Sequence, residues 1–307
     1  MGTTWSVTYV SEARPASVRE AIESTLELVN ASMSTYRPES EISQINAGTV
    51  NEPVSVSSAF ADVLRAALYV GEKSDGAYDI TVAPLVDLWG FGAGSEADWQ
   101  RPSTEAVDEA LAQVGQAGIE WDAANSTLIR RKPVRLDFSS IAKGYGVDRI
   151  AEALEALGIG DYLVEIGGEI RVAGLSPRGD TWRIAVEQPR AGRRGIAEAL
   201  DVTDMAIATS GDYRNFMEVD GVRYSHMIDP RTGHPVSHDL VSVTVLHEQC
   251  MMADAWATAL SVLGPEAALQ VASDNDLSVY LMVRDGEAYE RVLSPAFTAQ
   301  FGTLAEE

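Results

Sequence analysis

Hydrophobic and polar positions alternate along the chain in patterns typical of a protein that mixes helices and strands. We predict strands over residues 3–10, near 117–138, over most of 161–247 and over 278–284. The predicted helices cover residues 16–32, 58–74, 103–114, 140–158, 253–263 and 265–274, with a short helix at the end of the chain. A polar loop is expected from residue 33 to about residue 56.

The order of these elements favours one fold class. Runs of strands with helices grouped between them indicate an α+β protein rather than a doubly wound parallel sheet. No composition break or low-complexity linker interrupts the 307 residues, so we expect one compact unit over residues 1–307. No run of 18 apolar residues is present, which predicts no membrane span, and the chain opens in strand-like alternation without the apolar core of a signal peptide.

Composition narrows the classes of partner. The net charge is −23, from 46 acidic against 23 basic residues, and this excess argues against nucleic acid or an anionic membrane surface as a partner. An anionic ligand would need local cations, for which Lys143, Arg37 and a metal ion are the candidates. The single cysteine, Cys250, cannot form an internal disulfide, and we expect it to be a buried structural thiol.

One short segment, residues 136–148, combines an acid, two hydroxyls and a lysine at a predicted strand-to-helix junction. A strand from Val134 to Phe138 would place Asp137 at its end, and Ser139 or Ser140 would cap the following helix. The backbone N–H groups of the first helical turn would then face an anion such as a phosphate, with Lys143 nearby. The alternative, in which the acid and serine are only caps and Lys143 is solvated, stays open on this segment alone.

A second segment suggests a metal ion. Asp254 and Thr258 lie four residues apart in a predicted apolar helix, so they share one helix face. Two oxygens on an apolar surface suit a hard cation, and Mg²⁺ is typically held by one or two carboxylates together with waters and substrate phosphates. The alternative is an acid placed by the helix dipole and a threonine that bonds to its own helix.

A third segment suggests proton transfer. His226 lies where a predicted strand ends, and histidine is the side chain whose ordinary pKa suits a general base near neutrality. Asp229 and Arg231 follow in an Asp-Pro and Thr-Gly turn, where they could orient the histidine or meet a phosphate. Asp, Pro and Gly also favour a turn for steric reasons alone, and the two readings are compatible.

Common nucleotide and zinc patterns do not account for these residues. The chain has neither G-x-G-x-x-G after a strand nor G-x-x-x-x-G-K-[ST], which argues against a Rossmann or P-loop site. The four histidines fall close together in the sequence, but their spacing fits no standard zinc pattern and no cysteine partners accompany them.

Taken in chain order, these segments resemble the ApbE family, the FAD:protein FMN transferases. The resemblance covers nearly the whole chain. The other segments that carry it are Met1-Gly2-Thr3-Thr4-Trp5, Met33-Ser34-Thr35-Tyr36-Arg37-Pro38, Ser40-Glu41-Ile42-Ser43 with Asn46, Gly76-Ala77-Tyr78-Asp79-Ile80-Thr81-Val82 with Pro84-Leu85-Val86, Leu88-Trp89-Gly90-Phe91-Gly92, and Gly167-Gly168-Glu169.

The resemblance implies a role for individual residues of this chain. It implies FAD as the donor and an Mg²⁺ site drawn from Ser140, Asp254 and Thr258. His226 resembles the proposed base, and we place Asp229 behind it. The fold that the resemblance implies is a T-fold-like architecture with an internal duplication. The positions that match FAD contacts are Met1, Tyr36, Ala77, Tyr78, Asp79, Asp137, Lys143, Ile228 and Ala257.

The implied reaction transfers FMN from FAD to a Ser or Thr hydroxyl of an acceptor flavoprotein and releases AMP. Hydrolysis of FAD to FMN and AMP and non-catalytic flavin carriage are the alternatives. The resemblance implies that a tyrosine at Tyr36 favours transfer, and a carrier would not need His226, Asp254 and Thr258 together. The resemblance also implies an acceptor with a Ser/Thr-Gly-Ala-Thr-like motif and an exported, lipid-anchored precursor, although a cytoplasmic location stays open.

Overall fold

The computed structural model describes residues 2–92, 99–188, 195–211, 216–219, 222–286 and 288–303, and the chain divides into two units. The first unit comprises Met1–Leu28, Ile141–Arg214 and Asp239–Glu307. The second comprises Val29–Ser140 and Asn215–His238. The prediction that residues 1–307 act as a single transferase domain stays a prediction. No helix of the described residues has the length and apolar character needed to cross a membrane.

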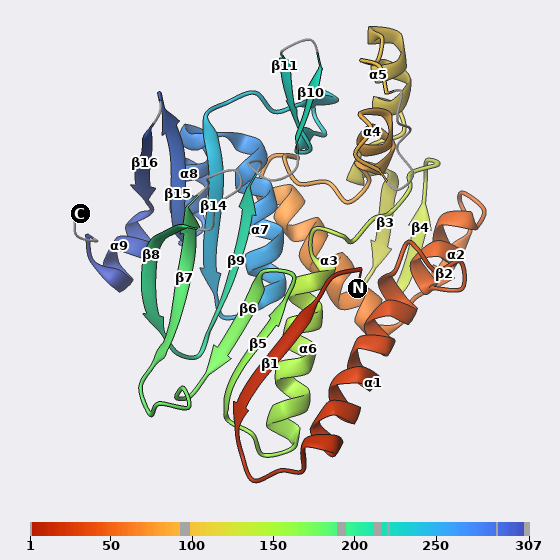
Figure 1. Cartoon of the computed structure of the whole chain (residues 1–307). Coiled ribbons are helices and arrows are strands. Elements are labelled where there is room, and N and C mark those ends of the chain that lie inside the picture. Colours follow the sequence, from red (N-terminus) through yellow and green to blue (C-terminus); the bar gives the residue numbers. More distant parts are fainter. Residues whose placement is uncertain are drawn as a thin grey trace. The chain divides into compact units, whose positions relative to one another are not determined.

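The first unit is built on a seven-stranded sheet in which every neighbouring pair is antiparallel (Figure 1). Its edge strands are the first strand of the chain and the last. In the order in which they pair, the strands are β1 (Trp5–Val10), β5 (Asp161–Ile166), β6 (Glu169–Ala173), β9 (Met205–Gly211), β14 (Leu240–His247), β15 (Ser278–Asp285) and β16 (Ala288–Leu293).

Helices cover one face of this sheet. Alternate residues of β5, namely Tyr162, Val164 and Ile166, pack with Val18 and Ile22 into one buried cluster. The helices of this unit are α1 (Pro15–Met33), whose first part belongs to it, α6 (Ala142–Ala156), α7 (Cys250–Leu263), α8 (Pro265–Asp274) and α9 (Pro295–Phe301). Leu163, from the other set of β5 side chains, packs against a second cluster, which contains residues of the hairpin of β7 (Trp182–Gln188) and β8 (Gly195–Val202) together with α9.

Helices α6 and α7 cap each other. The carboxylate of Asp148, in the second turn of α6, accepts the N–H groups of Cys250 and Met251 at 2.9 Å each, at the start of α7. In return, Oδ2 of Asp254, in the second turn of α7, accepts the N–H of Gly144 at 3.0 Å, in the first turn of α6. Each acid therefore satisfies N–H groups that a helix start leaves without partners. The predicted capping of α6 by Ser139 or Ser140 is wrong, because Ile141 occupies the cap position and makes no side-chain bond.

This mutual capping requires the two helices to approach closely. A Cβ atom added to Gly144 would lie 2.3 Å from the carbonyl oxygen of Cys250 and 2.8 Å from the Cα of Met251. Both contacts are with backbone atoms, which cannot swing aside as a side chain would. Cys250 is itself fully buried, as expected, and its Sγ lies 3.5 Å from the carbonyl oxygen of Ile170.

The second unit holds a small antiparallel sheet and a separate aromatic core. Trp89 packs against Trp99, Tyr224 and His234, and its indole N–H donates to the carbonyl of Gly233 at 2.8 Å. Its elements are α2 (Glu41–Ala47), β2 (Pro53–Ser55), α3 (Ser58–Lys73), α4 (Ala83–Leu88), α5 (Thr104–Leu111), η1 (Gln116–Gly118), β3 (Ile119–Asp122), β4 (Thr127–Arg130), β10 (Phe216–Val219), β11 (Val222–Ser225), β12 (Ile228–Asp229) and β13 (His234–Pro235).

Most predicted elements agree with the structure, and two of the failures can be traced to particular side chains. The expected polar loop after residue 33 contains α2, which begins where the Ser40 hydroxyl accepts the N–H of Ser43. The expected strand Val134–Phe138 is wrong. Its backbone is held at Leu136 by the side chain of Asn46, whose amide both donates and accepts at 2.8 Å, so no strand ladder forms there. Helix α4 and strand β16 were not predicted.

Replacing Gly144 by alanine should destabilise the protein, because the added methyl group cannot fit between the two helices. The expected loss is about 1–3 kcal/mol or more, as for other overpacked interiors. Urea unfolding of the variant measures it. Gly160→Ala is the control, since a Cβ there meets no atom within 4 Å and should leave stability nearly unchanged. Equal midpoints for the two variants would contradict close packing at Gly144.

Candidate functional site

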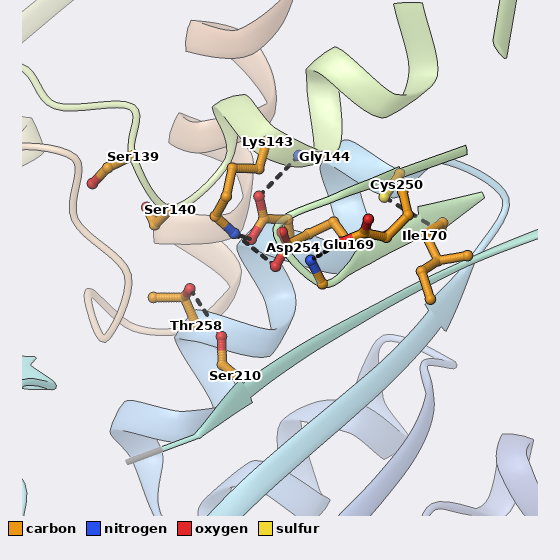
Figure 2. A network of polar contacts seen from close by, with 12 residues as sticks. Ser139, Ser140, Lys143, Gly144, Glu169, Ile170, Ser210, Cys250, Asp254 and Thr258 are labelled. Carbon is orange, nitrogen blue, oxygen red and sulfur yellow. Dashed lines mark hydrogen bonds and ion pairs between the residues drawn. The ribbon is translucent and has the colours of Figure 1, made fainter. Parts of the chain in front are cut away.

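The candidate site of the first unit centres on Lys143, which lies between two buried carboxylates (Figure 2). Its Nζ is 2.6 Å from Oε1 of Glu169 and 3.4 Å from Oδ1 of Asp254. The lysine is in the first turn of α6, Glu169 begins β6, and Asp254 is in the second turn of α7. The side chain of Lys143 is 29% exposed, against 4% for Glu169 and 3% for Asp254.

A glycine turn places Glu169. Gly167 and Gly168 join β5 to β6 with φ angles of +60° and +107°, a backbone that other residues rarely adopt. A Cβ on Gly167 would lie 2.9 Å from Cγ2 of Thr3 and 3.4 Å from Cδ of Lys143. The turn therefore leaves room for the aliphatic part of the lysine while it brings the glutamate to the ammonium.

The ionisable groups of this cluster shift one another's pKa values. Burial, and then the charge of Asp254, raise the pKa of Glu169 to about 8, although the ammonium of Lys143 opposes the change. Burial lowers the pKa of Lys143, but the two carboxylates outweigh it and raise that pKa above its usual value. Glu169 and Asp254 therefore share a single ammonium group, that of Lys143. Within the described part of the chain, Oε2 of Glu169 is buried without a hydrogen-bond partner.

Two hydroxyl groups, those of Thr258 on α7 and Ser210 on β9, lie next to each other. Thr258 follows Asp254 by one turn of α7, and its Oγ1 lies 3.4 Å from Oγ of Ser210 at the end of β9. Thr258 therefore has a partner on another element, rather than only its own helix. The described residues contain no group of three or more His, Cys, Asp or Glu arranged for a metal ion.

These donors fit one kind of metal site. A single carboxylate with hydroxyl oxygens matches Mg²⁺, which keeps several waters and shares substrate phosphates. The presence of two buried acids beside a single ammonium, and the unpartnered Glu169 oxygen, also favour an added cation. The same donor set, without histidine or cysteine, does not suit zinc.

The predicted residues of the second unit make separate hydrogen bonds within that unit. Ser140 donates its hydroxyl hydrogen to the Tyr78 hydroxyl at 3.0 Å, and Tyr78 is otherwise buried. Asp79 accepts the Thr81 N–H at 2.7 Å and the Gln116 N–H at 3.0 Å, although burial still raises its pKa. Asp137 accepts the N–H of Ser139 at 2.7 Å. The carboxylates of Asp79 and Asp137 therefore hold backbone N–H groups in place.

The other predicted flavin contacts differ in exposure. Tyr36 is 76% exposed and presents a flat ring to solvent. Ala77, Ile228 and Ala257 are buried, so any contact with a ligand would involve small surface or backbone groups. Met1 lies outside the described residues.

The predicted base lies in the second unit. The ring of His226 meets the ring of Phe91 edge-on, with centroids 6.3 Å apart. Asp229 is bound to Arg231 through both oxygens, at 2.9 Å from Nε and 2.8 Å from Nη2. This hydrogen bonding raises the pKa of Arg231. A carboxylate paired in this way is a weak base, so His226 is the better candidate of the two.

The structure thus gathers only some of the predicted residues in each unit. Lys143, Asp254 and Thr258 come together in the first unit, and the alternative of a solvated Lys143 is wrong. Sequence reasoning assigned no role to Glu169 or Ser210. The signal for Glu169 was an acid directly after Gly-Gly, which marks a tight turn leading into a strand. The expected free N–H groups of α6 are also reduced, because Gly144 donates to Asp254.

Comparison with known proteins identifies the family. The sequence model of the ApbE family matches residues 1–281. The chain belongs to the ApbE family. It is 44% identical to the FAD:protein FMN transferase of Vibrio cholerae over 303 residues, which covers 97% of this chain and 89% of that protein. The resemblance drawn from the sequence is thereby confirmed.

Solved ApbE structures share the fold. The flavin transferase ApbE from Vibrio cholerae matches with a TM-score of 0.90 at 42% identity, over 98% of this chain and 96% of that one. The apo form of the Pseudomonas stutzeri flavinyl transferase ApbE matches with a TM-score of 0.90 at 37% identity, over 99% and 95% of the two chains. The predicted α+β, ApbE-like fold is confirmed, whereas the T-fold-like duplication stays a prediction.

Glu169 should make stability depend on pH in the metal-free protein. Its pKa is about 8 in the folded state against an ordinary 4.5, so folding takes up a proton. The stability that this proton provides is complete below about pH 4.5 and is lost as the pH rises towards 8. In the presence of a chelator, the melting temperature of the wild type should therefore fall relative to Glu169→Gln over this range. Several degrees are expected, because about 1 kcal/mol shifts the melting temperature of a large domain by about 2–4 °C.

The control for this measurement is Glu152→Gln, the same change at an exposed residue of α6 that pairs with Arg149. Its melting temperature should run parallel to that of the wild type at every pH. A constant difference between the wild type and Glu169→Gln from acid to pH 8 would show that Glu169 does not titrate in this way.

Proposed function

We propose that this chain transfers FMN from FAD to a serine or threonine hydroxyl of an acceptor flavoprotein, in a Mg²⁺-dependent reaction that releases AMP. Family membership and the flavin transferase names of its relatives support the reaction class. The observation that carries the proposal is the cluster of Lys143, Asp254 and Thr258, which offers cationic and oxygen groups to a pyrophosphate. Residues 1–307 would act as one transferase domain.

The proposed reaction exchanges one bond to phosphorus for another. The oxygen of the acceptor hydroxyl attacks the FMN-side phosphorus, and the bond from that phosphorus to the bridging oxygen breaks. AMP leaves with the bridging oxygen, and the hydroxyl proton passes to a base. The barrier arises largely from charge that builds up around phosphorus, so positioning and neutralisation of that charge are the main tasks of the protein.

The first unit would supply most of the groups that meet this charge. Asp254 and Thr258 would hold Mg²⁺, and the family resemblance adds Ser140 as a third ligand. A bound Mg²⁺ neutralises charge on the pyrophosphate and orients it. The ammonium of Lys143 stays charged at any working pH, because its pKa is raised, and it would bind a non-bridging phosphate oxygen.

His226 would take the proton. The unperturbed pKa of a histidine side chain lies near neutrality, where a base and its conjugate acid are both available. Asp229 would support His226 indirectly, by fixing Arg231. The Arg231 guanidinium donates hydrogen bonds to both carboxylate oxygens of Asp229. The Arg231 side chain is 37% exposed, so its guanidinium retains donors for a phosphate.

FAD and the acceptor complete the proposal. Tyr36 offers an exposed ring for stacking on a flavin or adenine, and Lys143 would contact phosphate. The resemblance supplies the remaining contacts and an acceptor with a Ser/Thr-Gly-Ala-Thr-like motif. It also supports an exported, lipid-anchored precursor as the natural form. The other proposed FAD contacts are Met1, Ala77, Tyr78, Asp79, Asp137, Ile228 and Ala257.

One assay separates the proposed transferase from a hydrolase and a carrier. The protein is incubated with FAD, Mg²⁺ and a domain that carries the acceptor motif. A transferase gives a flavin-fluorescent acceptor band on a denaturing gel, with one AMP for each FMN attached. FAD consumed to free FMN and AMP without a labelled band would favour the hydrolase. Tight FAD binding without AMP would favour the carrier.

Asp254→Asn should nearly abolish Mg²⁺-dependent transfer, because the cation loses its carboxylate. Loss of one strong stabiliser of transition-state charge typically costs about 10²–10³ in rate, or about 3–4 kcal/mol. Asp148→Asn is the matched control, since Asp148 is also a buried acid that caps a helix start. Both variants should melt lower than the wild type, and only Asp254→Asn should lose turnover at a temperature where both are folded. Equal activity of the two would remove Asp254 from the site.

His226→Ala should lose covalent transfer while it keeps FAD affinity, because the imidazole acts on the incoming hydroxyl and does not hold the donor. The rate should fall by roughly 10²–10⁴, and the rise of rate with pH near the histidine pKa should disappear. Acceptor fluorescence on gels and calorimetry with FAD measure the two effects. His247→Ala, at the end of β14, is the control and should label the acceptor normally. A folded His226→Ala protein that labels at the wild-type rate would exclude the base assignment.

A further inference from the structure

Lys143 and a metal ion would compete for the same oxygen. Nζ of Lys143 lies 3.4 Å from Oδ1 of Asp254, while the other oxygen, Oδ2, is already bound by the N–H of Gly144. A cation that binds Asp254 therefore meets the ammonium at the one oxygen not occupied by backbone. A metal cation and the ammonium would then both lie next to Oδ1 of Asp254, and two positive charges that close together repel each other strongly in a site of low polarity.

The ammonium must have another partner for a cation to bind well. It cannot simply leave for solvent, because its aliphatic part packs by the Gly167 turn and only 29% of the side chain is exposed. Glu169 provides the partner. Its Oε1 is 2.6 Å from Nζ, closer than Asp254, and its carboxylate is 4% exposed.

Glu169 also has capacity beyond this single contact. Among the described residues, its Oε2 is buried and accepts no hydrogen bond. The ammonium carries three donors, and a shift of Nζ towards this second oxygen would satisfy a group that is costly to leave unpaired. The pair is thus able to take Lys143 away from Asp254 without a change in the backbone.

We propose that Glu169 is a positioning residue that sets the affinity of the site for a divalent cation, by holding Lys143 away from Asp254. The inference rests on the proposed Mg²⁺-dependent function and extends it to a residue to which no role has been assigned. In the cation-bound protein, Glu169 retains the ammonium at the edge of the site, where it faces the phosphates of the donor. Without that carboxylate, the ammonium moves fully onto Asp254 and blocks the cation.

A double-mutant cycle on metal binding tests this role. Mg²⁺ is titrated by calorimetry into the full chain without FAD, for the wild type, Glu169→Gln, Lys143→Met and the double variant. Glu169→Gln should weaken Mg²⁺ binding by about 10–100-fold, as is typical for a residue that supports a metal ligand from outside. In the Lys143→Met background, the same change should cost only a few-fold, because no ammonium remains to be held. The two effects should therefore be strongly non-additive.

Two further variants keep the test decisive. Glu152→Gln removes an exposed carboxylate of α6 and should bind Mg²⁺ like the wild type. Glu169→Asp keeps the charge on a side chain shorter by one methylene and should weaken binding less than Glu169→Gln. If Glu169→Gln does not fold, as judged by its melting curve, Glu169→Asp in the two lysine backgrounds provides the same comparison.

Two outcomes would overturn the inference. An equal loss of affinity with and without Lys143 would mean that Glu169 attracts or ligates the cation directly. Unchanged affinity in Glu169→Gln would mean that it has no influence on the cation. Failure of the proposed function looks different, since wild type and Asp254→Asn would then bind Mg²⁺ equally, or transfer would proceed in a chelator.

Discussion

The mutual capping of α6 and α7 is the constraint on which the rest of the first unit depends. A buried helix start leaves backbone N–H groups without hydrogen-bond partners, and a buried carboxylate needs hydrogen-bond donors. Both needs are met when a carboxylate of each helix accepts the free N–H groups at the start of the other. Asp148 serves α7 and Asp254 serves α6 across an approach that only glycine at position 144 permits. The acid proposed to bind the metal is therefore also part of what holds the two helices together.

The two capping acids differ in how their charge is balanced. Arg171 lies 2.8 Å from Oδ1 of Asp148, and the second carboxylate near this arginine, that of Glu155, is 3.8 Å away and half exposed to solvent. Lys143 instead lies between two buried carboxyl groups, those of Asp254 and Glu169, so this end of the pair has one ammonium for two buried acids. A purely structural cap needs only one close counter-charge, as at Asp148. The imbalance is understandable if a further cation belongs there, in a protein whose net charge is already −23.

Local patterns predicted most of the helices, and the strands β1 and β15, well, because apolar periodicity and caps report on short segments. They failed where a side chain from a distant part of the sequence forms the hydrogen bonds that a neighbouring strand would otherwise form. The segment before Phe138 alternates like a strand, yet its backbone pairs with Asn46, some 90 residues earlier in the chain. Lys143, Asp254 and Thr258 were predicted from their motifs, whereas Glu169 was recognised only as part of a motif. Its meeting with Lys143 depends on the packing of α6 beside the β5–β6 hairpin, which no local pattern encodes.

The arrangement also changes how an anion would be recognised. The sequence suggested that the first turn of α6 offers its backbone N–H groups to a phosphate, as in many nucleotide sites. In the structure, Asp254 accepts a hydrogen bond from the N–H of Gly144, so this N–H is not available to a phosphate. In the proposed function, recognition of a pyrophosphate would then rely more on Lys143 and on a cation at Asp254. Both would depend on the same few carboxylate oxygens, and this would make donor binding, metal binding and the packing of two helices parts of one equilibrium.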